Sequence, residues 1–106
     1  MVTLKQMLTL TAVLSLSTGL ALANSKGAEL YKKHNCHTCH GANGNAPIMP
    51  LYPKIGGQNA EYAIAQLKDI KSGKRNNGQS AAMKALTTSI SDADFKAISE
   101  WLATVK

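Results

Sequence analysis

Hydrophobic residues in the second half of the chain recur with the spacing of α-helices. After residue 59 they fall at positions i, i+4 and i+7, as Ala63, Leu67 and Ile70. Gly73 follows where a glycine commonly ends a helix, because glycine adopts the left-handed C-cap conformation without strain. This pattern predicts a helix that begins near Asn59 or Ala60 and ends at Gly73.

The last helix is the most clearly marked of the predicted elements. Its hydrophobic positions lie at i, i+3, i+7 and i+10, as Phe95, Ile98, Leu102 and Val105. The preceding Ser91-Asp92-Ala93-Asp94 resembles a capping box in which aspartate replaces the usual glutamate or glutamine. Similar patterns predict a first helix from Ser25 to about His34 and a short helix over about residues 80–86.

The stretch from Gly41 to Gly57 is rich in glycine and holds all three prolines of the chain. This composition predicts a loop, and so long a loop in a small domain is often functional. No stretch alternates convincingly between hydrophobic and polar residues, as an exposed strand would. The predicted fold class is therefore all-α.

An apolar run from Met7 to Ala23 precedes these elements, after a weak positive start at Met1 and Lys5. The run ends in Ala21-Leu22-Ala23, which resembles a signal-peptide cleavage site. We expect residues 1–23 to be a cleaved signal peptide and residues 24–106 to form one small domain that is exported to the periplasm. An uncleaved anchor is the less favoured alternative, because a membrane-spanning helix needs about 20 predominantly apolar residues.

The segment Cys36-His37-Thr38-Cys39-His40 matches C-x-x-C-H, the attachment signature of c-type haem. Two thiols at this spacing can each form a thioether with one vinyl group of the same haem. His40 is then held under the iron as an axial ligand. The chain has no other cysteine, and thioether bonds would consume both thiols in an oxidising compartment. The motif predicts one covalently attached haem c.

Two other interpretations of the cysteine pair have less support. A thioredoxin-like dithiol expects a βαβ setting, which the sequence does not show. A structural zinc site needs four ligands. The four candidates, Cys36, Cys39, His34 and His37, crowd into residues 34–39 with no second cluster downstream.

The second axial ligand decides whether the iron is closed or open to small molecules. Outside the signal peptide the candidates are His34, His37, Met49 and Met83. His37 should point away from the iron, and His34 lies on the attachment side, where the helix dipole favours it. Met49 resembles apolar loop packing. Met83 follows a glycine-containing turn that can return across the opposite haem face, and it is the favoured ligand.

The first axial ligand, His40, should also need a hydrogen-bond partner. A coordinating histidine usually donates its other ring N–H to a carbonyl, which fixes the ring, and Pro53 is the candidate for that carbonyl. Ligation by His40 and Met83 would raise the reduction potential. It would also fill both axial positions, which favours electron transfer over enzymatic chemistry.

The formal net charge is +6, and loss of Lys5 with the signal peptide leaves 6 − 1 = +5. The basic residues form no compact run with interleaved aromatics, which argues against nucleic-acid binding. A positive surface favours redox partners with acidic docking surfaces, although it could equally serve solubility. The expected docking residues are Lys54, Lys84 and the group from Lys71 to Arg75. We expect a monomer or a weak dimer.

Taken in order, these features resemble class I cytochromes c, in particular the small soluble bacterial monohaem type. The similarity covers Ser25 to Lys106. Its markers are Cys36–Gly41, Pro53–Gln58, Tyr62–Leu67, Gly73-Lys74-Arg75, Met83 and Ser91–Asp94.

The resemblance implies about four helices and loops wrapped around one haem. It also implies thioethers at Cys36 and Cys39 and axial ligation by His40 and Met83. The first and last helices should cross, with Tyr31 near the face from Phe95 to Leu102. The first helix departs from the class, because Gly27-Ala28-Glu29-Leu30-Tyr31 lacks the usual glycine–aromatic pairing.

The function implied is a one-electron carrier, not an enzyme, that moves electrons between periplasmic or membrane redox partners. The alternative is a haem enzyme or gas sensor with an open or labile sixth iron position. Against it, the sequence shows no distal histidine–arginine pair suited to peroxide cleavage. A subunit permanently docked to a larger oxidoreductase would share the residues of a free carrier.

Overall fold

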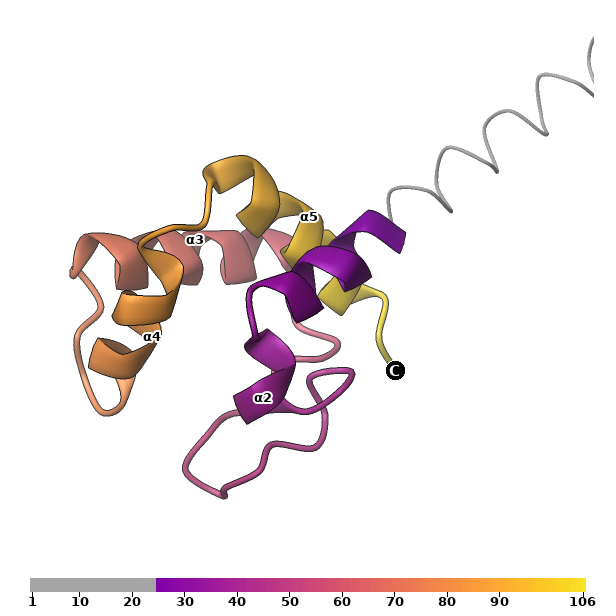
Figure 1. Ribbon diagram of the computed structural model, residues 1–106, viewed down its shortest axis with the longest axis horizontal. Coiled ribbons are helices and arrows are strands. Elements are labelled where there is room, and N and C mark those ends of the chain that lie inside the picture. Colours follow the sequence, from indigo (N-terminus) through magenta and orange to yellow (C-terminus); the bar gives the residue numbers. More distant parts are fainter. Residues whose placement is uncertain (1–24) are drawn as a thin grey trace, which may run out of the picture.

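The computed structural model describes residues 25–106, so the predicted signal peptide over residues 1–23 lies outside the described residues. The described part is helical and has no strand, which confirms the predicted all-α class. Within the described part a first helix ends at residue 33, and the others are α2 (Cys36–His40), α3 (Ala60–Ser72), α4 (Ser80–Thr87) and α5 (Asp92–Ala103) (Figure 1). Within these residues no helix is long and apolar enough to cross a membrane.

The ends of α3 and α5 are fixed by the local signals that the sequence carries. The Asn59 side chain accepts a hydrogen bond from the backbone N–H of Tyr62 at the start of α3. At its end, Gly73 is left-handed with φ 86°, and its N–H donates to the carbonyl of Ile70. Ser91 caps α5 by accepting from the N–H of Asp94 at 3.1 Å. These contacts satisfy backbone groups that a helix end leaves unpaired.

The predicted haem-attachment motif is itself a single helical turn, α2, which hydrophobic periodicity did not predict. A left-handed residue, Asn35 with φ 62°, separates it from the first helix. This reversal turns the chain sharply, so that α2 runs away from the first helix toward the long loop (Figure 1). A five-residue helix is too short to show a repeat in sequence.

The first helix crosses α5, as the resemblance implied. Leu30 and Tyr31 form the buried core with Ile98 and Leu102 of α5. The rings of Tyr31 and Trp101 pack with their centroids 5.0 Å apart at a tilt of 54°. Such tilted aromatic pairs add to the stabilisation from burial alone.

Gly27 makes this crossing possible, and the predicted absence of a glycine–aromatic pair is therefore wrong. A Cβ atom at position 27 would lie 2.5 Å from the Cβ of Trp101 and still closer to the backbone carbonyl of Ala97. Only glycine allows the two backbones to approach so closely. Tyr31 stands one helical turn after Gly27 and packs on Trp101. The pairing thus exists, with tyrosine four residues after the glycine.

The loop after α2 is tied back to the helix crossing at several points. The Tyr31 hydroxyl donates to the carbonyl of Gly41 at 2.5 Å. Gly44, with φ 77°, accepts from the N–H of Ile55 at 2.8 Å. The N–H of Gly57 donates to the carbonyl of Leu102 at 2.7 Å. The loop therefore has a defined course, which places one wall of the site.

Candidate functional site

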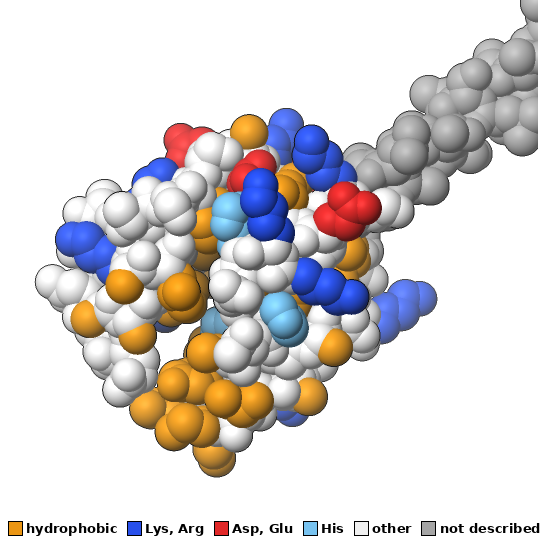
Figure 2. All heavy atoms as spheres, viewed as in Figure 1, with side chains coloured by type: hydrophobic (Ala, Val, Ile, Leu, Met, Phe, Trp, Pro, Cys, Tyr) orange, Lys and Arg blue, Asp and Glu red, His pale blue; other side chains and the backbone are white. Residues whose placement is uncertain are grey.

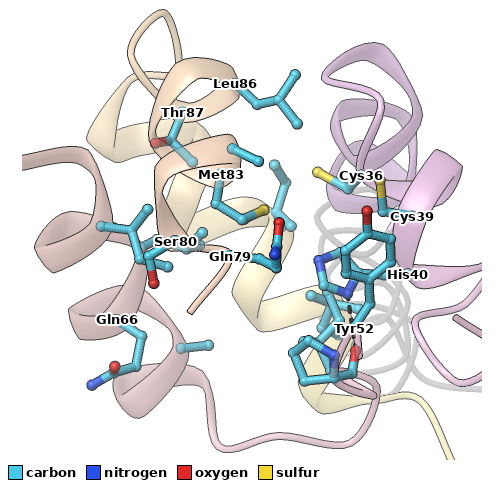
Figure 3. Close-up of a pocket in the computed structure, with 18 of the residues that line it drawn as sticks. Cys36, Cys39, His40, Tyr52, Gln66, Gln79, Ser80, Met83, Leu86 and Thr87 are labelled. Carbon is cyan, nitrogen blue, oxygen red and sulfur yellow. Dashed lines mark hydrogen bonds between the residues drawn. The ribbon is translucent and has the colours of Figure 1, made fainter. Parts of the chain in front are cut away.

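A cavity of about 480 Å³ lies between two groups of elements. Helix α2 and the loop after it form one wall of the cavity, and α3, α4 and α5 form the opposite wall (Figure 3). The hollow is visible in the space-filling view between α4 and the loop (Figure 2). Its volume falls within the range of about 300–1,000 Å³ that is usual for ligand and cofactor pockets.

His40, the last residue of α2, is buried on one wall and only 5% exposed. Its Nδ1 lies 2.9 Å from the carbonyl oxygen of Pro53, so the predicted hydrogen bond is present. A carbonyl can only accept, so Nδ1 must carry the proton and donate. The other ring nitrogen, Nε2, is left unprotonated in the neutral imidazole, which is the form that binds a metal.

Cys36 and Cys39 line the cavity beside His40, and both are free thiols (Figure 3). Burial raises the pKa of the Cys36 thiol to about 11, with a smaller contribution from the nearby Cys39. Among the described residues, no group of three or more His, Cys, Asp or Glu side chains could hold a metal ion. The zinc interpretation therefore gains no support.

Met83 lies in α4 on the wall opposite His40 and lines the cavity. Figure 3 shows its sulfur pointing from α4 toward the wall that carries His40 and the two cysteines. Met49 does not line the cavity and is 45% exposed. His37 also does not line the cavity. The arrangement thus brings Met83, and not Met49 or His37, to the face opposite His40.

His34 borders the cavity but is engaged in another contact. Its Nε2 lies 3.0 Å from a carboxylate oxygen of Asp94, which belongs to the first turn of α5. The sequence had suggested a dipole interaction for His34 and a capping role for the Asp94 side chain. In the structure only the Asp94 backbone N–H takes part in the cap, while its carboxylate joins the first helix to α5. The resemblance implied that the first and last helices cross, and this crossing could have indicated that His34 and Asp94 lie close together.

The remaining walls of the cavity are largely apolar. The side chains that pack there from α3, α5 and the turn before α5 include Leu67, Ile70, Ile90, Phe95 and Ile98. Tyr52 also lines the cavity, with its ring centroid 6.5 Å from that of His40, and nothing in the sequence had singled it out. The charged side chains among the lining residues are Lys54 and Arg75, and no aspartate or glutamate lines the cavity.

These residues fit a c-type haem on chemical grounds. Two thiols stand beside an imidazole with a free Nε2, and a thioether faces them across an apolar space. The absence of carboxylates from the lining residues, together with Lys54 and Arg75, suits a ligand that carries carboxylates of its own. The set therefore offers both covalent attachment and two axial donors.

Comparison with known proteins agrees with this chemistry. The family model for cytochrome c matches residues 25–106. Cytochrome c4 of Pseudomonas aeruginosa is 40% identical over 90 residues, which cover 84% of this chain and 43% of that protein. Cytochrome c-554(548) of Halomonas halodenitrificans is 32% identical over 54 residues, covering 51% of this chain and 65% of that protein.

A solved structure, reduced recombinant cytochrome c4 from Pseudomonas stutzeri, superimposes with a TM-score of 0.70 at 28% identity. The match covers 81% of this chain and 50% of that chain. The chain thus spans about half the length of the cytochrome c4 relatives it matches. Because the family model covers the whole described part, the chain belongs to the cytochrome c family.

Proposed function

We propose that this protein is a one-electron carrier of the periplasm and not an enzyme. It uses one covalently bound c-type haem, attached through Cys36 and Cys39, with His40 and Met83 as axial ligands. The observation that carries the proposal is the placement of His40 and Met83 on opposite walls of one apolar cavity, with both thiols beside His40 (Figure 3).

When bound, the haem supplies an iron that accepts and releases one electron. The protein's own residues keep the site the same in both oxidation states. His40 is oriented by its hydrogen bond to Pro53, which also raises the basicity of its free nitrogen. The Met83 thioether would fill the sixth position of a bound haem iron, and the largely apolar lining would limit the access of water to it. Little has to rearrange when the charge at the iron changes.

Docking of redox partners is proposed to use the positive surface around the cavity. Lys54 and Lys84 are exposed, and Lys54 also lines the cavity. Lys71 is a poor candidate, because its Nζ donates to the carbonyl of Ile90 at 2.5 Å and lies 5.5 Å from the centre of the Phe95 ring. We therefore restrict the proposed docking group to its exposed lysines, Lys54, Lys74 and Lys84. We expect partners with acidic surfaces.

The first test is the visible spectrum of the purified, reduced protein before and after addition of carbon monoxide. We expect no change, because Met83 occupies the sixth position. Met83→Ala should bind carbon monoxide, whereas the control Met49→Ala should behave as the unsubstituted protein. Carbon monoxide binding by the unsubstituted protein would refute closed His/Met ligation and favour the haem enzyme or gas sensor.

The docking proposal is tested by stopped-flow electron transfer with an acidic redox protein. Lys84→Glu should slow the second-order rate at low salt by about tenfold, since steering of this kind changes on-rates by about 10–10³. The loss should shrink as salt screens the charges. The control Lys26→Glu makes the same charge change on the first helix. Equal slowing by both variants would show that net charge matters and that no docking site surrounds the cavity.

A further inference from the structure

The chain contains two asparagine–glycine dipeptides, and the fold surrounds them differently. They are Asn43-Gly44 in the long loop and Asn77-Gly78 in the turn before α4. In such a pair the backbone nitrogen of the glycine can attack the side-chain carbonyl carbon of the asparagine, because glycine has no Cβ to obstruct the approach. Spontaneous deamidation begins with this attack. Its rate therefore depends on how freely the glycine nitrogen can move.

The pair Asn43-Gly44 is held by the fold. Gly44 is buried, and its N–H donates to the carbonyl of Gly41 at 3.2 Å. Its own carbonyl accepts from the N–H groups of Ile55 at 2.8 Å and Gly56 at 3.1 Å. A Cβ placed on Gly44 would lie 2.8 Å from the backbone nitrogen of Gly56. The Gly44 nitrogen can therefore attack the Asn43 side chain only after this packing has opened.

The pair Asn77-Gly78 is exposed and lies in a tight turn. The carbonyl of Asn77 accepts from the N–H of Ser80 at 3.1 Å, and Gly78 has φ 55°. Among the described residues, no group accepts a hydrogen bond from the N–H of Gly78. No atom beyond its chain neighbours would lie within 4 Å of a Cβ placed there. The connection between α3 and α4 also projects from the other elements (Figure 1), so the Gly78 nitrogen is unhindered in the folded protein.

We propose that Asn77 is a site of spontaneous deamidation in the folded protein, and that the product loosens the wall that carries Met83. The Gly78 nitrogen gives its proton to solvent and forms a bond to Cγ of Asn77, while the side-chain amide nitrogen leaves as ammonia. Water then opens the resulting succinimide ring. Cleavage of the new bond to Cγ gives aspartate, whereas cleavage of the original main-chain bond gives isoaspartate. Water is the only co-reactant, and no electrons are transferred.

Isoaspartate changes the turn that begins α4 in two ways. The carbonyl of Asn77 that accepts from Ser80 becomes a free carboxylate outside the main chain. The main chain also becomes one methylene longer, three residues before the helix that carries Met83. The effect on the iron rests on the proposed function, because it assumes that Met83 fills the sixth position. The deamidation itself does not depend on that assumption.

The test is peptide mapping of the haem-loaded protein after incubation at mildly alkaline pH. Trypsin cleaves after lysine and arginine, so Asn43 and Asn77 fall in separate peptides, residues 34–54 and 76–84. We expect the products to form at Asn77 at least about tenfold faster than at Asn43, because unpairing a buried hydrogen-bonding group suppresses the open state by about that factor. Unfolding in urea should remove the difference. Asn77→Gln should abolish the products in the second peptide, whereas the matched control Asn43→Gln should not.

Carbon monoxide binding by the reduced protein is measured before and after the incubation. Incubation should increase binding by the unsubstituted protein and by Asn43→Gln, but not by Asn77→Gln. Equal rates at the two asparagines of the folded protein, or no reaction at Asn77, would overturn the modification site. Isoaspartate at Asn77 without a gain in binding would overturn its effect on Met83. Binding by fresh protein would instead contradict the proposed ligation, and peptide mapping would still decide whether Asn77 is modified.

Discussion

Replacing Gly27 with alanine should destabilise the protein although it improves the helix in which the residue lies. Alanine favours an interior helical position over glycine by about 1 kcal/mol. Against this gain, the added Cβ would lie 2.5 Å from the Cβ of Trp101, whereas carbon atoms pack best at about 3.5–4.0 Å. The helices must therefore separate by about 1 Å at this point. The closer neighbour, the backbone carbonyl of Ala97, cannot rotate away as a side chain could.

Separation of the helices also weakens the packing of Tyr31 on Trp101, whose ring centroids are 5.0 Å apart. Overpacking typically costs about 1–3 kcal/mol, and the contact with the Ala97 backbone, which cannot move aside, puts this substitution in the upper part of that range, at about 2–3 kcal/mol. After the gain in helix propensity is subtracted, we expect a net loss of about 1–2 kcal/mol in the free energy of unfolding. For a domain of this size that loss lowers the Tm by about 5–15 °C.

The assay is urea denaturation of the haem-loaded protein, followed by circular dichroism at fixed pH. Glu29→Ala is the control, because Glu29 is exposed in the same helix and its replacement should change stability by less than about 0.5 kcal/mol. A Gly27→Ala variant as stable as the unsubstituted protein, or more stable, would refute the reasoning. It would mean that the helices can separate without cost and that Gly27 does not determine the crossing.

Three further substitutions test contacts around the site. Burial raises the pKa of the Tyr31 hydroxyl from its ordinary value near 10 to about 12, so folding stability falls as the pH rises through this interval. Tyr31→Phe should lose about 1 kcal/mol at pH 7 with its hydrogen bond and show a shallower alkaline fall in urea titrations. His34→Ala should lose about 1 kcal/mol with the bond to Asp94, with no further loss when Asp94→Ala is added in a double-mutant cycle. Lys71→Met should remove the hydrogen bond to Ile90 that fixes the chain after α4, so that Met83 is displaced more easily and the reduced protein binds more carbon monoxide. Lys74→Met, at an exposed lysine nearby, should leave carbon monoxide binding unchanged.

The parts of the fold that were predictable are those encoded by neighbouring residues. The repeats that give α3 and α5 their buried faces can be read within a few turns of sequence. Their caps are equally local, since Ser91 binds a backbone N–H three residues later. The attachment motif is local too, and the hydrogen bond from His40 at the end of α2 to Pro53 in the following loop joins residues only thirteen positions apart.

The parts that were missed depend on residues brought together by the fold. His34 and Asp94 are sixty positions apart, and each had a plausible local role that the structure replaces with their mutual contact. Gly27 was misjudged for the same reason. The role of Gly27 depends on its close approach to Trp101 of α5. The glycine–aromatic pair was not identified in the sequence, because its aromatic residue is a tyrosine, Tyr31. The one-turn α2 was missed because so short a helix has no repeat.

The two walls of the cavity are held by different means, and this difference bears on which of the two proposed axial ligands is held more firmly. The His40 wall is held by the hydrogen bond to Pro53 and by the bond from Tyr31 to Gly41, and the proposed thioethers join the haem to the same wall. The Met83 wall is α4, which packs against α3, with its exit fixed by the bond from Lys71 to the carbonyl of Ile90.

Local destabilisation should therefore release Met83 before His40, while the haem stays covalently attached. A protein in that state has an open sixth position and the chemistry of the alternative function. The closed site of a carrier thus depends on contacts that keep α4 in place, and Lys71 contributes to the fold more than to partner docking. If Lys71→Met left carbon monoxide binding unchanged, packing of α4 on α3 alone would be sufficient to hold Met83 at the site.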